Sequence, residues 1–81
     1  MATTKHAFSV TMALADNIRE LRNTHGITQS ELADAIGVSH PRISEIEKDR
    51  ANPTLSTISK LARYFGVTEA DLLSKKLLEK A

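Results

Sequence analysis

The side chains best suited to specific chemistry are gathered in residues 39–50, where polar groups of several kinds are interspersed with isoleucines. If this segment is helical, a rotation of about 100° per residue places one polar set opposite Ile43 and Ile46. That set consists of His40, Pro41, Ser44, Glu45 and Lys48. It offers a ring, a hydroxyl, a carboxylate and an ammonium group, which suits recognition by hydrogen bonds better than a face that is merely solvated.

The sequence contains no comparable arrangement of residues for catalysis or metal binding. His6, His25 and His40 are far apart, and no carboxylate stands near them at metal-ligand spacing. No serine lies in a nucleophile-elbow motif, and no glycine-rich loop could hold a phosphate. We therefore expect no enzyme activity, no cofactor and no metal site.

Length and composition narrow the protein class. A chain of 81 residues forms one domain at most and has little room to enclose a catalytic cavity. It contains no cysteine, so it has neither a disulfide nor a thiolate metal site. No apolar run approaches the roughly 20 residues that span a bilayer, and the first residues lack the apolar stretch of a signal peptide. We therefore expect a cytoplasmic protein with no membrane contact.

Apolar spacing predicts where the first helix must lie. Leu14, Ile18 and Leu21 recur at positions i, i+4 and i+7 of one helical face, and Gly26 is a stop signal. A helix over residues 11–25 follows.

The residues before this helix show no period. We expect residues 1–10 to form a flexible N-terminal arm, in which Phe8 and Val10 could dock on the body of the protein. The expected folded domain then covers residues 11–81.

Two further helices are expected on either side of a tight turn. Thr28 and Glu31 form a capping-box pattern that begins the second helix. That helix must stop at Gly37, because glycine adopts the left-handed conformation at low steric cost. Val38 then supplies a buried contact, and Ser39 caps the third helix.

Turn-forming residues end the third helix near residues 48–50. Thr54 caps a fourth helix, which Gly66 ends, and Thr68 with Asp71 resembles a capping box for a fifth. The apolar stripes of these last helices are Leu55, Ile58, Leu61, Ala62 and Phe65 in the fourth, and Leu72, Leu73, Leu77 and Leu78 in the fifth. No segment alternates with the period of a strand, so the prediction is an all-α protein of five helices.

Residues 28–47, TQSELADAIGVSHPRISEIE, combine a capped helix, a glycine turn and a second capped helix. This pattern is typical of a helix-turn-helix, whose second helix projects from the protein. Such a helix fits the DNA major groove, which is about 12 Å wide.

The same segment closely resembles the Xre family of phage repressor and Cro-like regulators, and the resemblance extends over residues 17–73. The matching residues include Ile18, Leu21, Arg22, Gly26, Thr28, Gln29, Leu32, Ala33, Gly37, Val38, Ser39, Ile43, Ser44, Ile46, Glu47, Pro53, Leu61, Ala62 and Leu72. The resemblance implies a compact, five-helix, lambda-repressor-like domain. It also implies sequence-specific binding of double-stranded DNA through the third helix, and regulation of transcription, with repression as the expected output.

The resemblance assigns roles to individual polar residues. Gln29 would place its amide on a DNA phosphate, while His40, Pro41 and Glu45 would touch base edges. Because a carboxylate can accept a hydrogen bond from the cytosine amino group, Glu45 predicts a C·G pair beneath it. The full set of expected DNA-binding residues is Thr28, Gln29, Ser39, His40, Pro41, Arg42, Ser44, Glu45, Lys48 and Arg50.

One structural pair and two departures from the family pattern also follow from the resemblance. Arg22 and Glu47 match a salt bridge between the first helix and the end of the third. Asp49 stands where relatives commonly have glycine, but Asp tolerates the left-handed conformation. Pro41 stands where relatives often have a polar donor, which leaves an apolar contact there and gives Arg42 more weight.

A homodimer is expected on energetic grounds. One helix that reads about three or four base pairs cannot reach specific affinity against genomic competition. A two-fold dimer would place two reading helices about 34 Å apart on a palindromic operator. The fourth and fifth helices are the expected interface, with surplus leucines of the fifth buried against the second copy.

Two alternatives stay open. Relatives with a segment similar to residues 41–47 include antitoxins of toxin–antitoxin operons, so the first alternative is an antitoxin-type regulator with a toxin partner. The second alternative is a protein-interaction module that has lost DNA binding. It is favoured by the net charge of +1 and the pI of 8.1, which is below the value of about 9 typical of nucleic-acid binders. If the protein is a DNA-binding regulator, we expect it to be a bacterial or phage protein located at the nucleoid.

Overall fold

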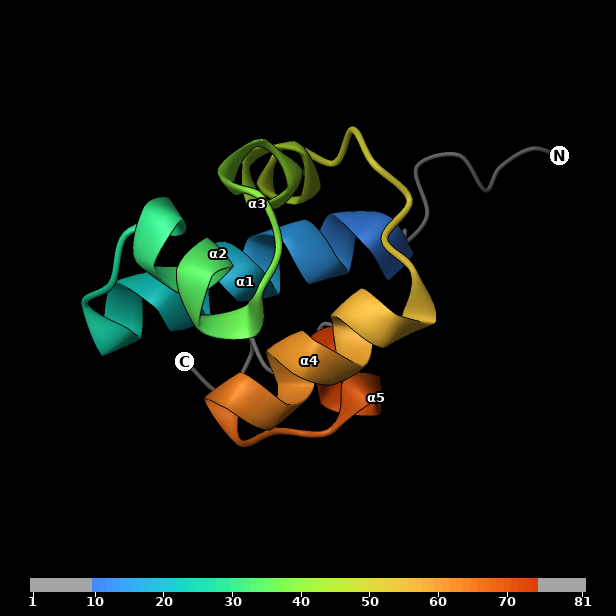
Figure 1. The fold of residues 1–81 in the computed structure, drawn as a ribbon. Coiled ribbons are helices and arrows are strands. Elements are labelled where there is room, and N and C mark those ends of the chain that lie inside the picture. Colours follow the sequence, from blue (N-terminus) through green and yellow to red (C-terminus); the bar gives the residue numbers. More distant parts are fainter. Residues whose placement is uncertain (1–9, 75–81) are drawn as a thin grey trace, which may run out of the picture.

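The longest helix, α1 (Val10–His25), passes behind the other elements, with α3 above it and α4 below it in the view of Figure 1. The computed structural model describes residues 10–74. Within this range the remaining helices are α2 (Gln29–Ile36), α3 (His40–Glu47), α4 (Leu55–Phe65) and α5 (Glu69–Leu72), and there is no strand. The predicted all-α fold with five helices is therefore confirmed.

Side-chain caps start each helix after the first. In each case a serine or threonine hydroxyl accepts a hydrogen bond from the backbone N–H three residues later, which satisfies one of the free donors of the first turn. These caps are Thr28, Ser39, Thr54 and Thr68. The two expected capping boxes, at Thr28 and Thr68, are both formed.

The turn between α2 and α3 has the predicted backbone. Gly37 is left-handed, with φ of 74°, and the Val38 N–H donates to the Ala33 carbonyl at 3.0 Å. Asp49, just after α3, also has a positive φ of 57°, as expected for the position where relatives have glycine. Gly37 and Asp49 thus adopt the left-handed conformation just after α2 and α3, the two helices of the helix-turn-helix.

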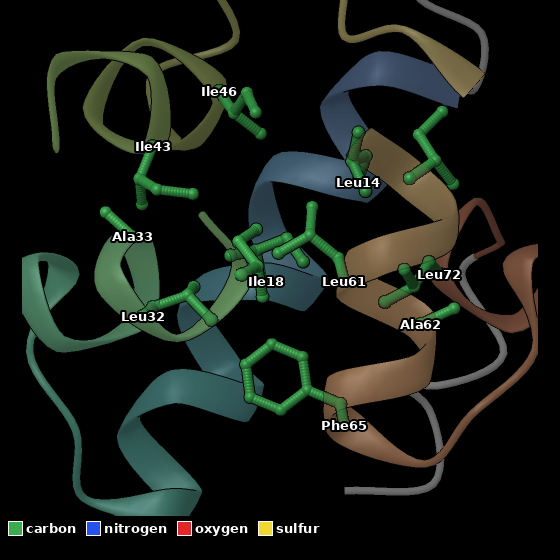
Figure 2. Close-up of a cluster of buried hydrophobic side chains, with 12 residues drawn as sticks. Leu14, Ile18, Leu32, Ala33, Ile43, Ile46, Leu61, Ala62, Phe65 and Leu72 are labelled. Carbon is green, nitrogen blue, oxygen red and sulfur yellow. The ribbon is translucent and has the colours of Figure 1, made fainter. Parts of the chain in front are cut away.

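All five helices contribute to one apolar core. Its fully buried large side chains are Leu14, Ile18, Leu32, Ile43, Ile46, Leu61 and Leu72. Figure 2 shows Ile18 of α1 and Leu61 of α4 near the centre of this cluster, with Ile43 of α3 beside Ala33 of α2. The inner face of α3 is thus held against α1 and α2.

Some expectations about apolar residues were wrong. Leu55 is 73% exposed, because it is the first residue of α4 and lies before the stretch of that helix that contacts the core. Val10 does not dock as part of an arm but begins α1, and it is 49% exposed. Val38 is half-buried rather than buried, although it packs against the core.

The predicted fifth helix is shorter than its leucine pattern indicated. It ends at Leu72, which is buried, and Leu73 is half-buried. Leu77, Leu78 and residues 1–9 of the expected arm lie outside the described residues. Across residues 10–74, no helix has the length and hydropathy needed to cross a bilayer.

Asn17 joins the two ends of the described chain. It is completely buried in α1, and its Nδ2 donates to the carbonyl oxygens of Asp71, Leu72 and Ser74 at 3.3, 2.7 and 2.9 Å. These bonds satisfy carbonyl groups at the end of α5, which has few hydrogen bonds of its own. Asn17 was not predicted to be buried, because asparagine is usually exposed.

Candidate nucleic-acid interface

The outer face of α3 is accessible over its whole length. His40 and Pro41 are exposed, Ser44 and Glu45 are half-buried, and the four residues line a shallow hollow of about 290 Å³. Figure 1 shows α3 along the upper edge of the molecule, with no other helix covering its outer side. The surface expected to face DNA is thus not packed inside the monomer.

The start of α3 explains how a proline fits into this face. The Ser39 hydroxyl accepts a hydrogen bond from the Arg42 N–H at 3.3 Å, and Pro41 lies in the first turn. A proline there costs no helical hydrogen bond, since the first N–H groups of a helix have no partner within it. Pro41 therefore adds an apolar group to the outer face without disturbing the helix.

A buried ion pair holds the other end of α3. The Arg22 Nε lies 2.8 Å from Oε2 of Glu47, and Arg22 Nη2 lies 3.1 Å from Oε1, so the expected pair is present and bidentate. The Glu47 side chain is 3% exposed and that of Arg22 is 17% exposed. The hydrogen bonds and charge of Glu47 raise the pKa of Arg22 despite partial burial. A third contact, from Arg22 Nη1 to the Ile27 carbonyl at 3.0 Å, orients the guanidinium.

Gln29 connects this ion pair to the beginning of α3. Its Nε2 donates to Oε1 of Glu47 at 3.0 Å, and its Oε1 lies 3.2 Å from Nε2 of His40. The resemblance implied that this amide would lie on a DNA phosphate. In the structure both of its polar atoms are engaged by protein groups, which are 18 and 11 residues away in sequence.

A groove of about 630 Å³ lies beside α3, between α1 and the segment after α3. Its basic lining residues are Arg19, Arg22, Lys48 and Arg50. Arg22 pairs with Glu47 and Arg19 pairs with Asp16, whereas Lys48 and Arg50 have no ion-pair partner within residues 10–74. The two unpaired cations are therefore available to an anion.

Arg19 was not among the expected site residues. Besides pairing with Asp16, it donates from Nη1 to the Glu47 carbonyl oxygen at the end of α3. A cation at a helix C-terminus interacts favourably with the helix dipole. Arg19 lies in the middle of α1, where nothing in the sequence indicates a contact with the end of α3.

Eight of the ten expected DNA-binding residues fall into three groups. His40, Pro41, Ser44 and Glu45 share the hollow on α3, while Lys48 and Arg50 line the groove beside it. A second hollow of about 540 Å³ at the start of α2 brings Thr28 and Gln29 together with His40. Thr28 and Ser39 use their hydroxyls as helix caps, and Arg42 is exposed on α3.

Comparison with known proteins gives a consistent result. The helix-turn-helix family HTH_3 matches residues 18–72. The chain is 40% identical over 62 residues to the HTH-type transcriptional regulator DdrOP3 of Deinococcus deserti, covering 76% of this chain and 48% of that protein. It is 38% identical over 60 residues to the cryptic phage CTXphi transcriptional repressor RstR of Vibrio cholerae, covering 74% of this chain and 54% of the repressor. The chain thus spans about half the length of these curated relatives.

A solved structure extends the likeness to three dimensions. The hypothetical transcription factor NHTF from Neisseria superposes with a TM-score of 0.80 at 33% sequence identity, covering 90% of this chain and 86% of that one.

Proposed function

This chain belongs to the HTH_3 family of helix-turn-helix proteins, of the Xre and phage repressor type, and from this premise we propose that it binds double-stranded DNA and regulates transcription. The observation that carries the proposal is the two-sided character of α3. Ile43, Ile46 and Glu47 anchor its inner face, while its outer face is polar and open. A short helix whose only role is to pack against the rest of the fold would not need an open, polar outer face of this kind.

In the proposed complex α3 lies in the major groove and reads base edges. His40, Pro41 and Glu45 contact the bases, with Ser44 beside them. Glu45 accepts a hydrogen bond from a cytosine amino group. Lys48 and Arg50, whose charges are unpaired within the described chain, neutralise phosphates on one side of the helix.

The remaining expected residues complete the phosphate contacts. Arg42 is exposed on α3, and Thr28 and Gln29 stand at the start of α2, where free backbone N–H groups and the helix dipole favour an anion. Ser39 shapes the surface through its role as helix cap.

The proposed output is repression by a homodimer on a palindromic operator. Two copies would set their α3 helices about 34 Å apart, one turn of DNA. The C-terminal part of the chain, α4 and α5, is the proposed dimer interface. Two exposed apolar residues on α4, Leu55 and Tyr64, support this choice.

Salt dependence of DNA affinity tests the proposal directly. The logarithm of the binding constant for a mixed pool of duplexes should fall linearly with the logarithm of the salt concentration, because counterions are released from the phosphates. Lys48→Ala should reduce the slope by about 1 for each bound copy, and so by about 2 for the dimer, while Lys60→Ala on α4 should leave it unchanged. Absence of salt-dependent binding would favour a protein-interaction module instead.

Selection from random duplexes tests the assignment of α3. A palindromic consensus is the expected result, and Glu45→Gln should change the preferred base at one position of each half-site. The matched variant Glu20→Gln, on an exposed position of α1, should select the wild-type consensus. If Glu45→Gln selects that consensus too, Glu45 does not read a base.

A further inference from the structure

A chain of hydrogen bonds runs from the buried ion pair to the first residue of α3. Glu47 accepts from Arg22 and from Nε2 of Gln29, and Oε1 of Gln29 meets Nε2 of His40 at 3.2 Å. Three helices supply its members, since Arg22 comes from α1, Gln29 from α2, and His40 and Glu47 from α3.

The chemistry of Glu47 determines which way the Gln29 amide points. A carboxylate that is ion-paired with an arginine has only acceptor atoms. The amide must therefore turn its NH₂ group toward Glu47, which leaves its carbonyl oxygen facing His40. The opposite orientation would set two acceptors 3.0 Å apart beside a nearly buried carboxylate.

The amide orientation in turn determines which ring nitrogen of His40 carries the hydrogen. Because the Gln29 oxygen only accepts, Nε2 of His40 must be the donor. In a neutral imidazole the other nitrogen, Nδ1, is then an acceptor. No group within residues 10–74 forms a hydrogen bond with Nδ1, and His40 is exposed on the outer face of α3.

We propose that Gln29 is a positioning residue that fixes the tautomer of His40, and that His40 thereby selects a base that carries an amino group in the major groove. Adenine offers N6–H₂ and cytosine N4–H₂ there, whereas guanine and thymine present acceptors only. This inference rests on the proposed function, and it names the chemical class of base that the first residue of α3 reads.

Protonation of His40 should reverse the selection. An imidazolium has N–H groups at both nitrogens, so Nδ1 becomes a donor and fits the N7 and O6 acceptors of guanine. Two charged side chains share the hollows that His40 lines. They are Arg22 of α1 and Glu45 of α3, and the facing residue of α2 is the neutral Gln29.

The first experiment measures base preference against pH. Four duplexes differ only at the pair whose preference is lost in His40→Ala, and their relative affinities are measured between pH 8 and pH 5.5. At pH 8 the wild-type protein should favour the duplex with adenine or cytosine over that with guanine by about fivefold or more. Toward pH 5.5 this ratio should fall below one. A preference for guanine at pH 8, or a ratio that does not change with pH, overturns the inference.

Two variants separate positioning from a structural role. Gln29→Met keeps the side-chain length but cannot form either hydrogen bond, so the ratio at pH 8 should fall to about twofold or less. His25→Gln removes another histidine, which lies at the end of α1 and contacts Phe65. It should keep the wild-type ratio and its pH dependence. A Gln29→Met protein with the wild-type ratio contradicts the role of Gln29.

The second experiment needs no DNA. Long-range ¹H–¹⁵N correlation spectra of the free 81-residue chain distinguish the two imidazole tautomers of His40. At pH 8 the wild-type ring should carry its hydrogen on Nε2, and Gln29→Met should give a mixture. An Nδ1–H tautomer in the wild-type protein overturns the inference and leaves DNA binding untouched. If the salt titration shows no DNA binding, the proposed function fails and the base selection fails with it.

Discussion

Glu47 is the residue on which the position of α3 depends most directly. Its carboxylate is nearly buried and accepts hydrogen bonds from Arg22 and Gln29. Charges removed from water are stable only when each is matched by a partner, so the loss of one member leaves the other uncompensated.

Replacing Glu47 by alanine should therefore lower the free energy of unfolding by about 2 to 4 kcal/mol. The measurement is urea unfolding followed by circular dichroism. Asp16→Ala is the matched control, because the Asp16–Arg19 pair has side chains that are 38% and 45% exposed. Exposed pairs contribute about 1 kcal/mol or less. Equal losses of unfolding free energy in both variants would show that the buried pair contributes no more to stability than the exposed pair.

At the scale of elements, the turn between α2 and α3 sets the direction in which α3 projects. Gly37 has a φ of 74°, and a Cβ built there would meet nothing within 4 Å. The demand for glycine at this position is thus conformational and not a matter of space.

Gly37→Ala should cost about 1 kcal/mol in the free energy of unfolding, because a residue with a Cβ is strained in the left-handed region. Gly37→Asn should cost less, since asparagine tolerates that region through local hydrogen bonds. Thermal and urea unfolding of the two variants measures the difference. A larger loss for asparagine than for alanine would contradict the conformational explanation.

The start of α5 shows a second effect at this scale. Glu69 accepts a hydrogen bond from the Ser59 hydroxyl of α4 at 2.9 Å. The backbone N–H at the beginning of α5 lowers the pKa of Glu69, and Ser59 lowers it further. A carboxyl group whose pKa is depressed by folding stabilises the protein above its unfolded-state pKa and loses that contribution as the pH falls.

Ser59→Ala should raise the pKa of Glu69 toward its ordinary value and make stability less dependent on pH in the acid range. A titration of the glutamate side-chain carbons by NMR measures the shift. Ser56→Ala, at an exposed position of the same helix, should leave it unchanged. If Ser59→Ala gives the wild-type titration curve, the hydroxyl does not contribute.

For the molecule as a whole, the apolar surface that stays exposed bears on assembly. Leu55 is 73% exposed and Tyr64 is 41% exposed, both on α4. Large apolar side chains left in water gain free energy when a second copy covers them.

Replacing Leu55 and Tyr64 together by serine should therefore shift the protein toward monomer, at least tenfold in the dimer dissociation constant. Sedimentation equilibrium measures this constant. Val10→Ser on α1, where the side chain is 49% exposed, is the control and should leave the constant unchanged. A protein that is monomeric with and without DNA would contradict the proposed dimer.

The sequence by itself determined the helices and most of their ends; the end of α5 at Leu72 is the exception. The caps at Thr28, Ser39, Thr54 and Thr68 act on N–H groups three residues away, so their partners can be read directly from the sequence. The apolar periods likewise identified most of the core, because the helical repeat alone decides which side chains share a face.

Tertiary structure alone decided how distant residues meet. The contacts of Gln29 with Glu47 and His40, and of Asn17 with the end of α5, join residues between 11 and 57 positions apart. The exposure of Leu55 was also decided by tertiary structure, because the helical period predicts which side chains share a face but not which element covers that face. Such contacts depend on how the helices cross, and local hydrogen bonds and propensities do not specify those crossings.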